Sequence, residues 1–127
     1  MYTVMIVDDA AFMRQILRGF FETMGFQVVA EAKNGEEAVK HYSLLRPDLV
    51  TLDISMPEMD GFTAAKKMVA LNGSANIIMC SALGRKEMVM HAIASGAKDF
   101  IVKPLIKERL EQAVYHLLPE AEHVEHA

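Results

Sequence analysis

Short polar segments follow four apolar runs of this 127-residue chain. Asp8 and Asp9 follow the first run, Asp53 ends another, and Ser81 and Lys103 follow two more. Clustered carboxylates are ligands that suit Mg²⁺, whereas a lysine ammonium and a serine hydroxyl suit the oxygens of a phosphoryl group. Asp53 is the candidate nucleophile, because it would be held rigidly at the end of a buried strand. These residue types indicate phosphoryl chemistry at Asp53.

The elements that would position these residues alternate between strands and helices. Apolar runs at 4–7, 27–32, 49–53, 76–80 and 100–102 are typical of buried strands. Apolar residues then recur at helical spacing after each run, and Asn34 with Glu37 predicts the start of the second helix. The inner faces are expected to include Leu45 in the second helix and Ile93 in the fourth.

Five strand–helix repeats predict an α/β fold, (βα)5 and doubly wound, with a five-stranded parallel sheet covered by helices on both faces. Ligands bind such sheets at the carboxyl ends of the strands. We therefore expect Asp8, Asp9 and Asp53 to converge there. Three adjacent carboxylates repel one another, and a divalent cation together with the Lys103 ammonium would balance their charge.

Composition restricts the class of protein. The chain is 52% hydrophobic and 24% charged, which suits one globular domain, and we place this domain at 1–118 and a short flexible tail at 119–127. The net charge of −4 without a basic stripe argues against nucleic-acid binding. Cys80 is the single cysteine, and the first residues resemble neither a signal peptide nor a membrane span. We expect a cytoplasmic monomer without membrane contact.

The segments Asp8-Asp9, Asp53, Ser81-Ala82 and Lys103-Pro104 resemble the signature of the response-regulator receiver domain family. The resemblance covers residues 2 to about 118, and the flanking segments are similar to chemotaxis regulators within the family. It implies a flavodoxin-like sheet in strand order 2-1-3-4-5 and a cis bond before Pro104. It also implies that a sensor histidine kinase of the chemotaxis type phosphorylates Asp53.

The resemblance also assigns ligands for the metal and the phosphoryl group. Asp9, Asp53 and the backbone carbonyl of Ser55 would hold Mg²⁺, for which Mn²⁺ could substitute, and Asp8 would contribute through water. Ser81 and Lys103 would then bind the phosphoryl oxygens.

Three further positions follow from the resemblance. The family has an aromatic residue three positions before the lysine that turns inward on phosphorylation, and here it is Phe100. Because Phe100 has no hydroxyl to hold it outward, we expect it to be buried even without phosphate. Ser55 and Leu83 would flank the phosphoryl group and tune its lifetime, with Leu83 shielding it from water.

The leading interpretation is a single-domain regulator that binds a protein target when phosphorylated. Its partner face would include Lys86, Met90, Phe100 and Lys107, with a flagellar motor switch or another protein as target and a possible phosphatase as a further partner. An alternative is a phosphorelay intermediate that passes the group to a histidine phosphotransfer protein. Magnesium-dependent aspartyl-phosphate phosphatases resemble Asp-x-Asp, and Ser55 stands where their second acid would be, so we expect no conventional enzyme.

Overall fold

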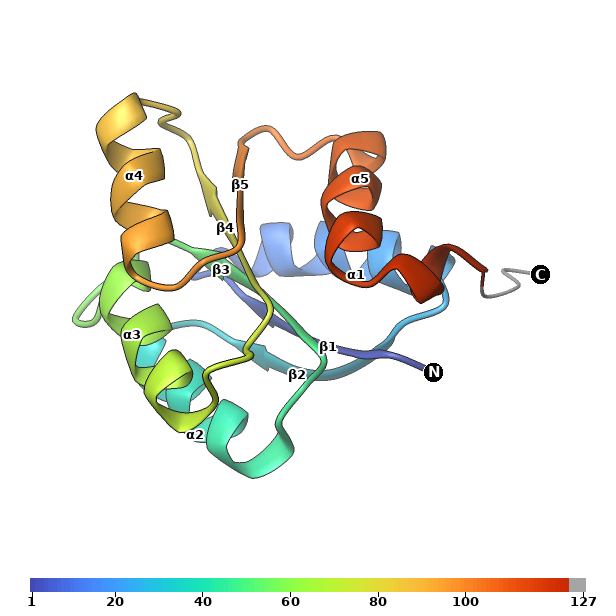
Figure 1. Ribbon diagram of the computed structural model, residues 1–127, viewed down its shortest axis with the longest axis horizontal. Helices are drawn as coiled ribbons and strands as arrows, with labels where there is room; N and C mark the ends of the chain where they lie inside the picture. The colour runs from blue at the N-terminus through green and yellow to red at the C-terminus, as the bar shows by residue number, and fades with distance from the viewer. Residues whose placement is uncertain (124–127) are drawn as a thin grey trace.

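The computed structural model describes residues 1–123 and contains one five-stranded parallel sheet in the order β2-β1-β3-β4-β5 (Figure 1). The strands are β1 (Thr3–Val7), β2 (Gln27–Ala32), β3 (Leu49–Asp53), β4 (Ile77–Ser81) and β5 (Asp99–Val102). The helices are α1 (Ala11–Thr23), α2 (Gly35–Leu45), α3 (Gly61–Leu71), α4 (Lys86–Ala94) and α5 (Lys107–Leu117). The predicted (βα)5 fold and strand order are confirmed.

Two apolar clusters lie on opposite faces of the sheet. Leu17 of α1 and Leu110 of α5 pack on one face, while Ala38 of α2, Met68 of α3 and Ala92 of α4 pack on the other. All five residues of the central strand β3 are buried. This double covering explains why β3 is apolar or β-branched at every position before Asp53.

The strand register brings the polar segments to one edge of the sheet. Val7 pairs with Leu52, so Asp8 follows β1 next to the position where β3 ends in Asp53. Asp53 in turn pairs with Cys80, directly before Ser81. The edge at the carboxyl ends of the strands therefore carries the predicted site.

Hydrogen bonds join the opposite edge into what we call the basal clamp, formed by Thr3, Asp48, Asn76 and Lys98. The carboxylate of Asp48 accepts hydrogen bonds from the backbone amide of Thr3 at 2.8 Å and from its hydroxyl at 3.1 Å. The amide of Asn76 donates to the carbonyl of Asp48 at 3.2 Å, and the ammonium of Lys98 donates to the Asn76 side chain at 2.9 Å. The clamp thus links the beginnings of β1, β3, β4 and β5.

Side-chain caps fix where two helices begin. Asn34 accepts a hydrogen bond from the amide of Glu37 at 2.8 Å, which confirms the predicted start of α2. Asp60 accepts from the amide of Thr63 at 2.8 Å and begins α3 directly after the loop that follows Asp53. Within residues 1–123, no helix has both the length and the apolar character that a bilayer crossing requires.

Two residues predicted to lie on inner helix faces are exposed instead. Leu45 is the last residue of α2 and is 49% exposed, and the helix ends there because Arg46 takes a left-handed backbone conformation with φ of 45°. Ile93 lies on the solvent side of the short helix α4, of which only Ala92 is fully buried. The predicted inner faces were wrong at these two positions.

The chain beyond α5 differs in part from the expected flexible tail. Pro119–His123 form a 3₁₀ helix, η1, and Ala121 is buried in the apolar cluster formed by α1 and α5. A small apolar side chain of this segment thus reaches the core, and the flexibility of the tail stays a prediction. The rest of the expected tail, 124–127, lies outside the described residues.

Candidate functional site

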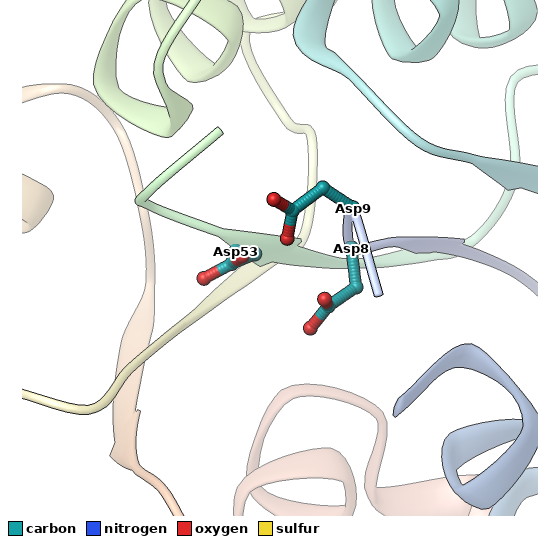
Figure 2. Close-up of side chains that lie close together, drawn as sticks. All are labelled: Asp8, Asp9 and Asp53. Carbon is teal, nitrogen blue, oxygen red and sulfur yellow. The ribbon is translucent and has the colours of Figure 1, made fainter. Parts of the chain in front are cut away.

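Three carboxylates meet at the carboxyl edge of the sheet. One oxygen from each of Asp8, Asp9 and Asp53 can be chosen so that all three lie within 4.8 Å of one another (Figure 2). Asp8 and Asp53 are buried, whereas Asp9 is exposed. The convergence predicted from the sequence is therefore present, with two acids shielded from water and one open to it.

Lys103 supplies a positive charge to this acidic cluster. Its Nζ lies 2.9 Å from Oδ2 of Asp8 and 3.4 Å from Oδ1 of Asp53. Its backbone amide donates a hydrogen bond to the carbonyl of Ser81 at 2.7 Å, and the bond to Pro104 is cis, as the resemblance implied. These contacts fix the loop after β5 and aim the ammonium at the two buried acids.

Hydrogen bonds fix the backbone and the carboxylate of Asp8. Its amide donates to the carbonyl of Ala32 at 3.0 Å, and its carboxylate accepts from the amide of Ala10 at 2.9 Å. Its carbonyl accepts from Nη1 of Arg14 at 2.7 Å. The sequence interpretation missed Arg14, because the spacing of residues along the chain gives no sign of a contact with a backbone carbonyl.

The protonation of the two central groups follows from burial and charge. Burial, followed by the charge of Asp8, raises the pKa of Asp53 from 3.8 to about 6, although Lys103 acts in the opposite direction. Burial lowers the pKa of Lys103, but the hydrogen bond to Asp8 and the charge of Asp53 outweigh it, and the net pKa lies above the usual value. At neutral pH Asp53 is therefore mostly ionised, although burial and the neighbouring Asp8 oppose its ionisation.

This donor set fits a divalent cation of the Mg²⁺ type. Carboxylate oxygens are the ligands that such ions prefer. Burial, followed by the charge of Asp8, raises the pKa of Asp53, and an added cation would favour the ionised carboxylate. The acidic cluster is thus compatible with Mg²⁺. The assignment of the Ser55 carbonyl as a further ligand stays a prediction.

Ser81, Phe100 and Leu83 are the further residues that the sequence assigns to the predicted phosphoryl chemistry. Ser81 ends β4, is 4% exposed, and its Oγ accepts a hydrogen bond from the amide of Leu83 at 3.1 Å. Phe100 is buried in the apolar cluster on the α3 and α4 side of the sheet. Leu83 is exposed in the loop that follows Ser81. The role of each residue in a phosphorylated state stays a prediction.

The residues of the predicted partner face differ in their exposure. Met90 and Lys86 are exposed on α4, and Lys107 is half-buried at the start of α5. Phe100 is buried in the apolar cluster, and its part in a partner face stays a prediction.

Two apolar residues of the same region escaped the sequence interpretation. Val102, the last residue of β5, and Ile106, in the loop before α5, are 48% and 59% exposed. The position of Val102 on an edge strand was the only signal that could have indicated its exposure.

The chain is similar to known proteins over most of its length. The model of the family described as "Response regulator receiver domain" matches residues 4–115 of this chain. Chemotaxis protein CheY of Bacillus subtilis (strain 168) is 53% identical over 113 residues, which cover 89% of this chain and 94% of that protein. Chemotaxis protein CheY of Thermotoga maritima is 51% identical over 111 residues, which cover 87% of this chain and 92% of that protein.

A solved structure is also similar to this chain. It is the crystal structure of the CheX-CheY-BeF3-Mg complex from Borrelia burgdorferi, matched with a TM-score of 0.89 and 40% identity over 92% of this chain and 89% of that chain.

Proposed function

The chain belongs to the response regulator receiver domain family, of the CheY type, and from this premise we propose that it signals by accepting a phosphoryl group on Asp53 from a sensor histidine kinase. Proteins of this type are signalling proteins of two-component chemotaxis systems and not conventional enzymes. The convergence of Asp8, Asp9, Asp53 and Lys103 at one edge of the sheet carries the proposal.

In the proposed transfer, a carboxylate oxygen of Asp53 attacks the phosphorus of a phosphohistidine or of acetyl phosphate. A new O–P bond forms, the bond from phosphorus to the donor breaks, and the donor leaves with that electron pair. The attack requires ionised Asp53, which predominates above a pH of about 6. The Lys103 ammonium, 3.4 Å from Asp53, is placed to neutralise the incoming phosphoryl oxygens.

Asp9, Asp53 and the Ser55 carbonyl are the proposed ligands of Mg²⁺ or Mn²⁺, and Asp8 is proposed to contribute through water. When bound, this cation supplies the positive charge that the transferred phosphoryl group requires. Asp9 is open to water, which gives a hydrated ion access to the cluster.

Ser81 is proposed to respond to the phosphoryl group through the loop that follows it, while Phe100 is already buried. The Ser81 hydroxyl oxygen accepts from the amide of Leu83, which leaves its hydrogen to donate to a phosphoryl oxygen. A shift of Ser81 toward the phosphate would move the loop at 82–85. We expect Phe100 to keep its buried rotamer in both states, and an outward ring in a crystal of the unphosphorylated protein would contradict this.

The lifetime of the phosphorylated state is expected to depend on Ser55 and Leu83. Ser55 has no carboxylate that could act as a general base on water, so hydrolysis should be slow. The apolar side chain of Leu83 would keep water away from the acyl phosphate.

We propose that the output surface consists of Lys86, Met90, Val102, Ile106 and Lys107. Two lysines supply positive charge, of which Lys86 is exposed and Lys107 is half-buried. The other three residues are apolar and exposed. Such a surface suits a protein target with an apolar face and acidic residues. A flagellar motor switch is the proposed target, and a partner of the CheX type is proposed from the Borrelia burgdorferi complex.

The test of Asp53 uses acetyl phosphate with MgCl₂ and intact-protein mass spectrometry. We expect one added phosphoryl group on the wild type and none on Asp53→Asn, with Glu58→Gln as a control that removes an exposed acid of the neighbouring loop. Addition to Asp53→Asn, or no addition to the wild type, contradicts the proposal.

The test of output is the binding of a motor-switch peptide with and without beryllofluoride and Mg²⁺. Tighter binding of the loaded wild type and unchanged binding of Asp53→Asn are expected. Transfer of labelled phosphate from Asp53 to a histidine phosphotransfer protein, without peptide binding, would instead indicate the phosphorelay alternative.

A further inference from the structure

We propose that Arg14 is a positioning residue for the acidic cluster: anchored on Glu31, its guanidinium holds the Asp8 carbonyl and so orients Asp9 for metal binding. The inference rests on the proposed function, since it concerns the same divalent cation. It assigns a role to a residue that touches neither the metal ligands' carboxylates nor Lys103.

The geometry is a relay from β2 to the loop after β1. Glu31 on β2 accepts a hydrogen bond from Nε of Arg14 at 3.2 Å, and Nη1 of Arg14 donates to the carbonyl oxygen of Asp8 at 2.7 Å. The two nitrogens belong to one planar guanidinium, so both bonds fix the same plane. The Arg14 side chain is only 19% exposed, which limits the competition of water for these bonds.

The Asp8 carbonyl matters because of the peptide bond to which it belongs. The planar unit that contains this carbonyl also contains the amide of Asp9, and its orientation sets where the Asp9 backbone begins. The Asp8 carboxylate has its own anchors in Ala10 and Lys103, whereas Asp9 is exposed and depends on its backbone for its position. Arg14 therefore controls mainly the open ligand of the cluster.

Arg18 offers a matched control. It lies one helical turn after Arg14 and binds the same Glu31, with Nη2 at 2.6 Å and Nε at 2.8 Å from Oε2. No hydrogen bond between Arg18 and Asp8 exists in the described part of the chain. Loss of either arginine thus removes one positive charge and one contact between α1 and β2, but only loss of Arg14 releases the Asp8 carbonyl.

The sign of the effect separates positioning from electrostatics. A cation near an acidic cluster repels a metal ion, so by charge alone Arg14→Ala would tighten Mg²⁺ binding. If Arg14 positions Asp9, the same variant weakens Mg²⁺ binding. Groups that orient ligands typically change metal affinity by about 10- to 100-fold, and we expect a weakening of roughly 10-fold.

The experiment titrates the full-length wild type, Arg14→Ala, Arg14→Lys and Arg18→Ala with MgCl₂, following the backbone amide resonances of residues 8–10. Roughly 10-fold weaker binding is expected for both Arg14 variants, because a lysine cannot hold Glu31 and the Asp8 carbonyl in one plane. Arg18→Ala should stay within about twofold of the wild type. If Arg14→Ala does not fold, Arg14→Lys decides the outcome.

A metal-free measurement completes the test. In EDTA, the amide resonances of Asp9 and Ala10 should shift in Arg14→Ala and stay in place in Arg18→Ala. Tighter Mg²⁺ binding by Arg14→Ala, or equal effects of the two arginine variants, would overturn the inference while leaving the proposed function intact. A wild type that binds no Mg²⁺ would overturn both.

Discussion

Replacement of Asp53 by asparagine is expected to stabilise the metal-free protein at neutral pH. Asp53 is 6% exposed and lies beside the buried carboxylate of Asp8. Ionisation of Asp53 therefore destabilises the native state relative to the unfolded chain. An asparagine has nearly the same shape and removes this electrostatic cost.

The size of the effect follows from the pKa of Asp53. The pKa rises from 3.8 in the unfolded chain to about 6 in the native state. At about 1.4 kcal/mol for each pKa unit, the native state loses up to about 3 kcal/mol when Asp53 ionises. The variant gives up the contact between Asp53 and Lys103 but keeps Lys103 paired with Asp8 at 2.9 Å. We expect a gain of about 1 to 3 kcal/mol in the free energy of unfolding.

The dependence on pH has a defined sign and window. Below pH 3.8 Asp53 is protonated in both states, so its charge does not separate the variant from the wild type. Between pH 3.8 and about 6, Asp53 loses its proton in the unfolded wild type before it does so in the native state. The stability of the wild type relative to the variant therefore falls as pH rises. Above a pH of about 6 Asp53 is mostly ionised in both states, and the stability difference between wild type and variant levels off.

Urea unfolding in EDTA, followed by circular dichroism at pH 4.5 and pH 7.5, measures this difference. MgCl₂ should largely remove the difference, because ligand at 100 times its Kd stabilises the wild type by about 2.7 kcal/mol and the variant lacks one ligand. Glu58→Gln serves as the control for net charge. Equal or lower stability of Asp53→Asn at pH 7.5 in EDTA, or a difference that does not grow with pH, would refute the reasoning.

Three further predictions concern other parts of the site. Gly61→Ala should lower the free energy of unfolding, measured in urea, by about 1 to 3 kcal/mol, because a Cβ there would lie 2.5 Å from the Asp53 carbonyl oxygen. As a control, Gly73→Ala adds a Cβ in open space and should change the free energy of unfolding by less than about 0.5 kcal/mol. Equal effects of the two variants would contradict this. Lys103→Met should raise the pKa of Asp53 above about 6, because the ammonium lowers it, and a carboxyl NMR titration that finds an unchanged or lower pKa would count against the charge argument. Leu83→Gln should shorten the half-life of the acyl phosphate, measured by mass spectrometry after acetyl phosphate is removed, and an unchanged half-life would exclude shielding by Leu83.

Local patterns were sufficient to predict the elements but not their order. The apolar run at 49–53 and the helical spacing from Met13 to Met24 both depend on which faces are buried, and this leaves a direct trace in the sequence. Strand order depends on which strands pair, and no periodicity encodes that. It came from the resemblance to receiver domains and is confirmed by the pairing of β1 with β2 and β3.

The site was predictable where it depends on strand ends. Asp8, Asp53 and Ser81 had to meet, because parallel strands end at the same edge of the sheet. Arg14 and Glu31 were not predictable, because they lie 17 residues apart and their types suit any exposed surface. The burial of Phe100 was predictable from its missing hydroxyl, and its ring lies in the apolar cluster on the α3 and α4 side of the sheet.

The basal clamp has a practical consequence for measuring motion in this protein. It ties the beginnings of four strands together at the edge away from Asp53, whereas the loop at 82–85 lies at the other edge. Gly73, close in sequence to Asn76, is exposed and has open space around it. A spin label at Gly73 therefore provides a fixed reference, and its distance to a second label at Leu83 would report displacement of the phosphate-side loop alone.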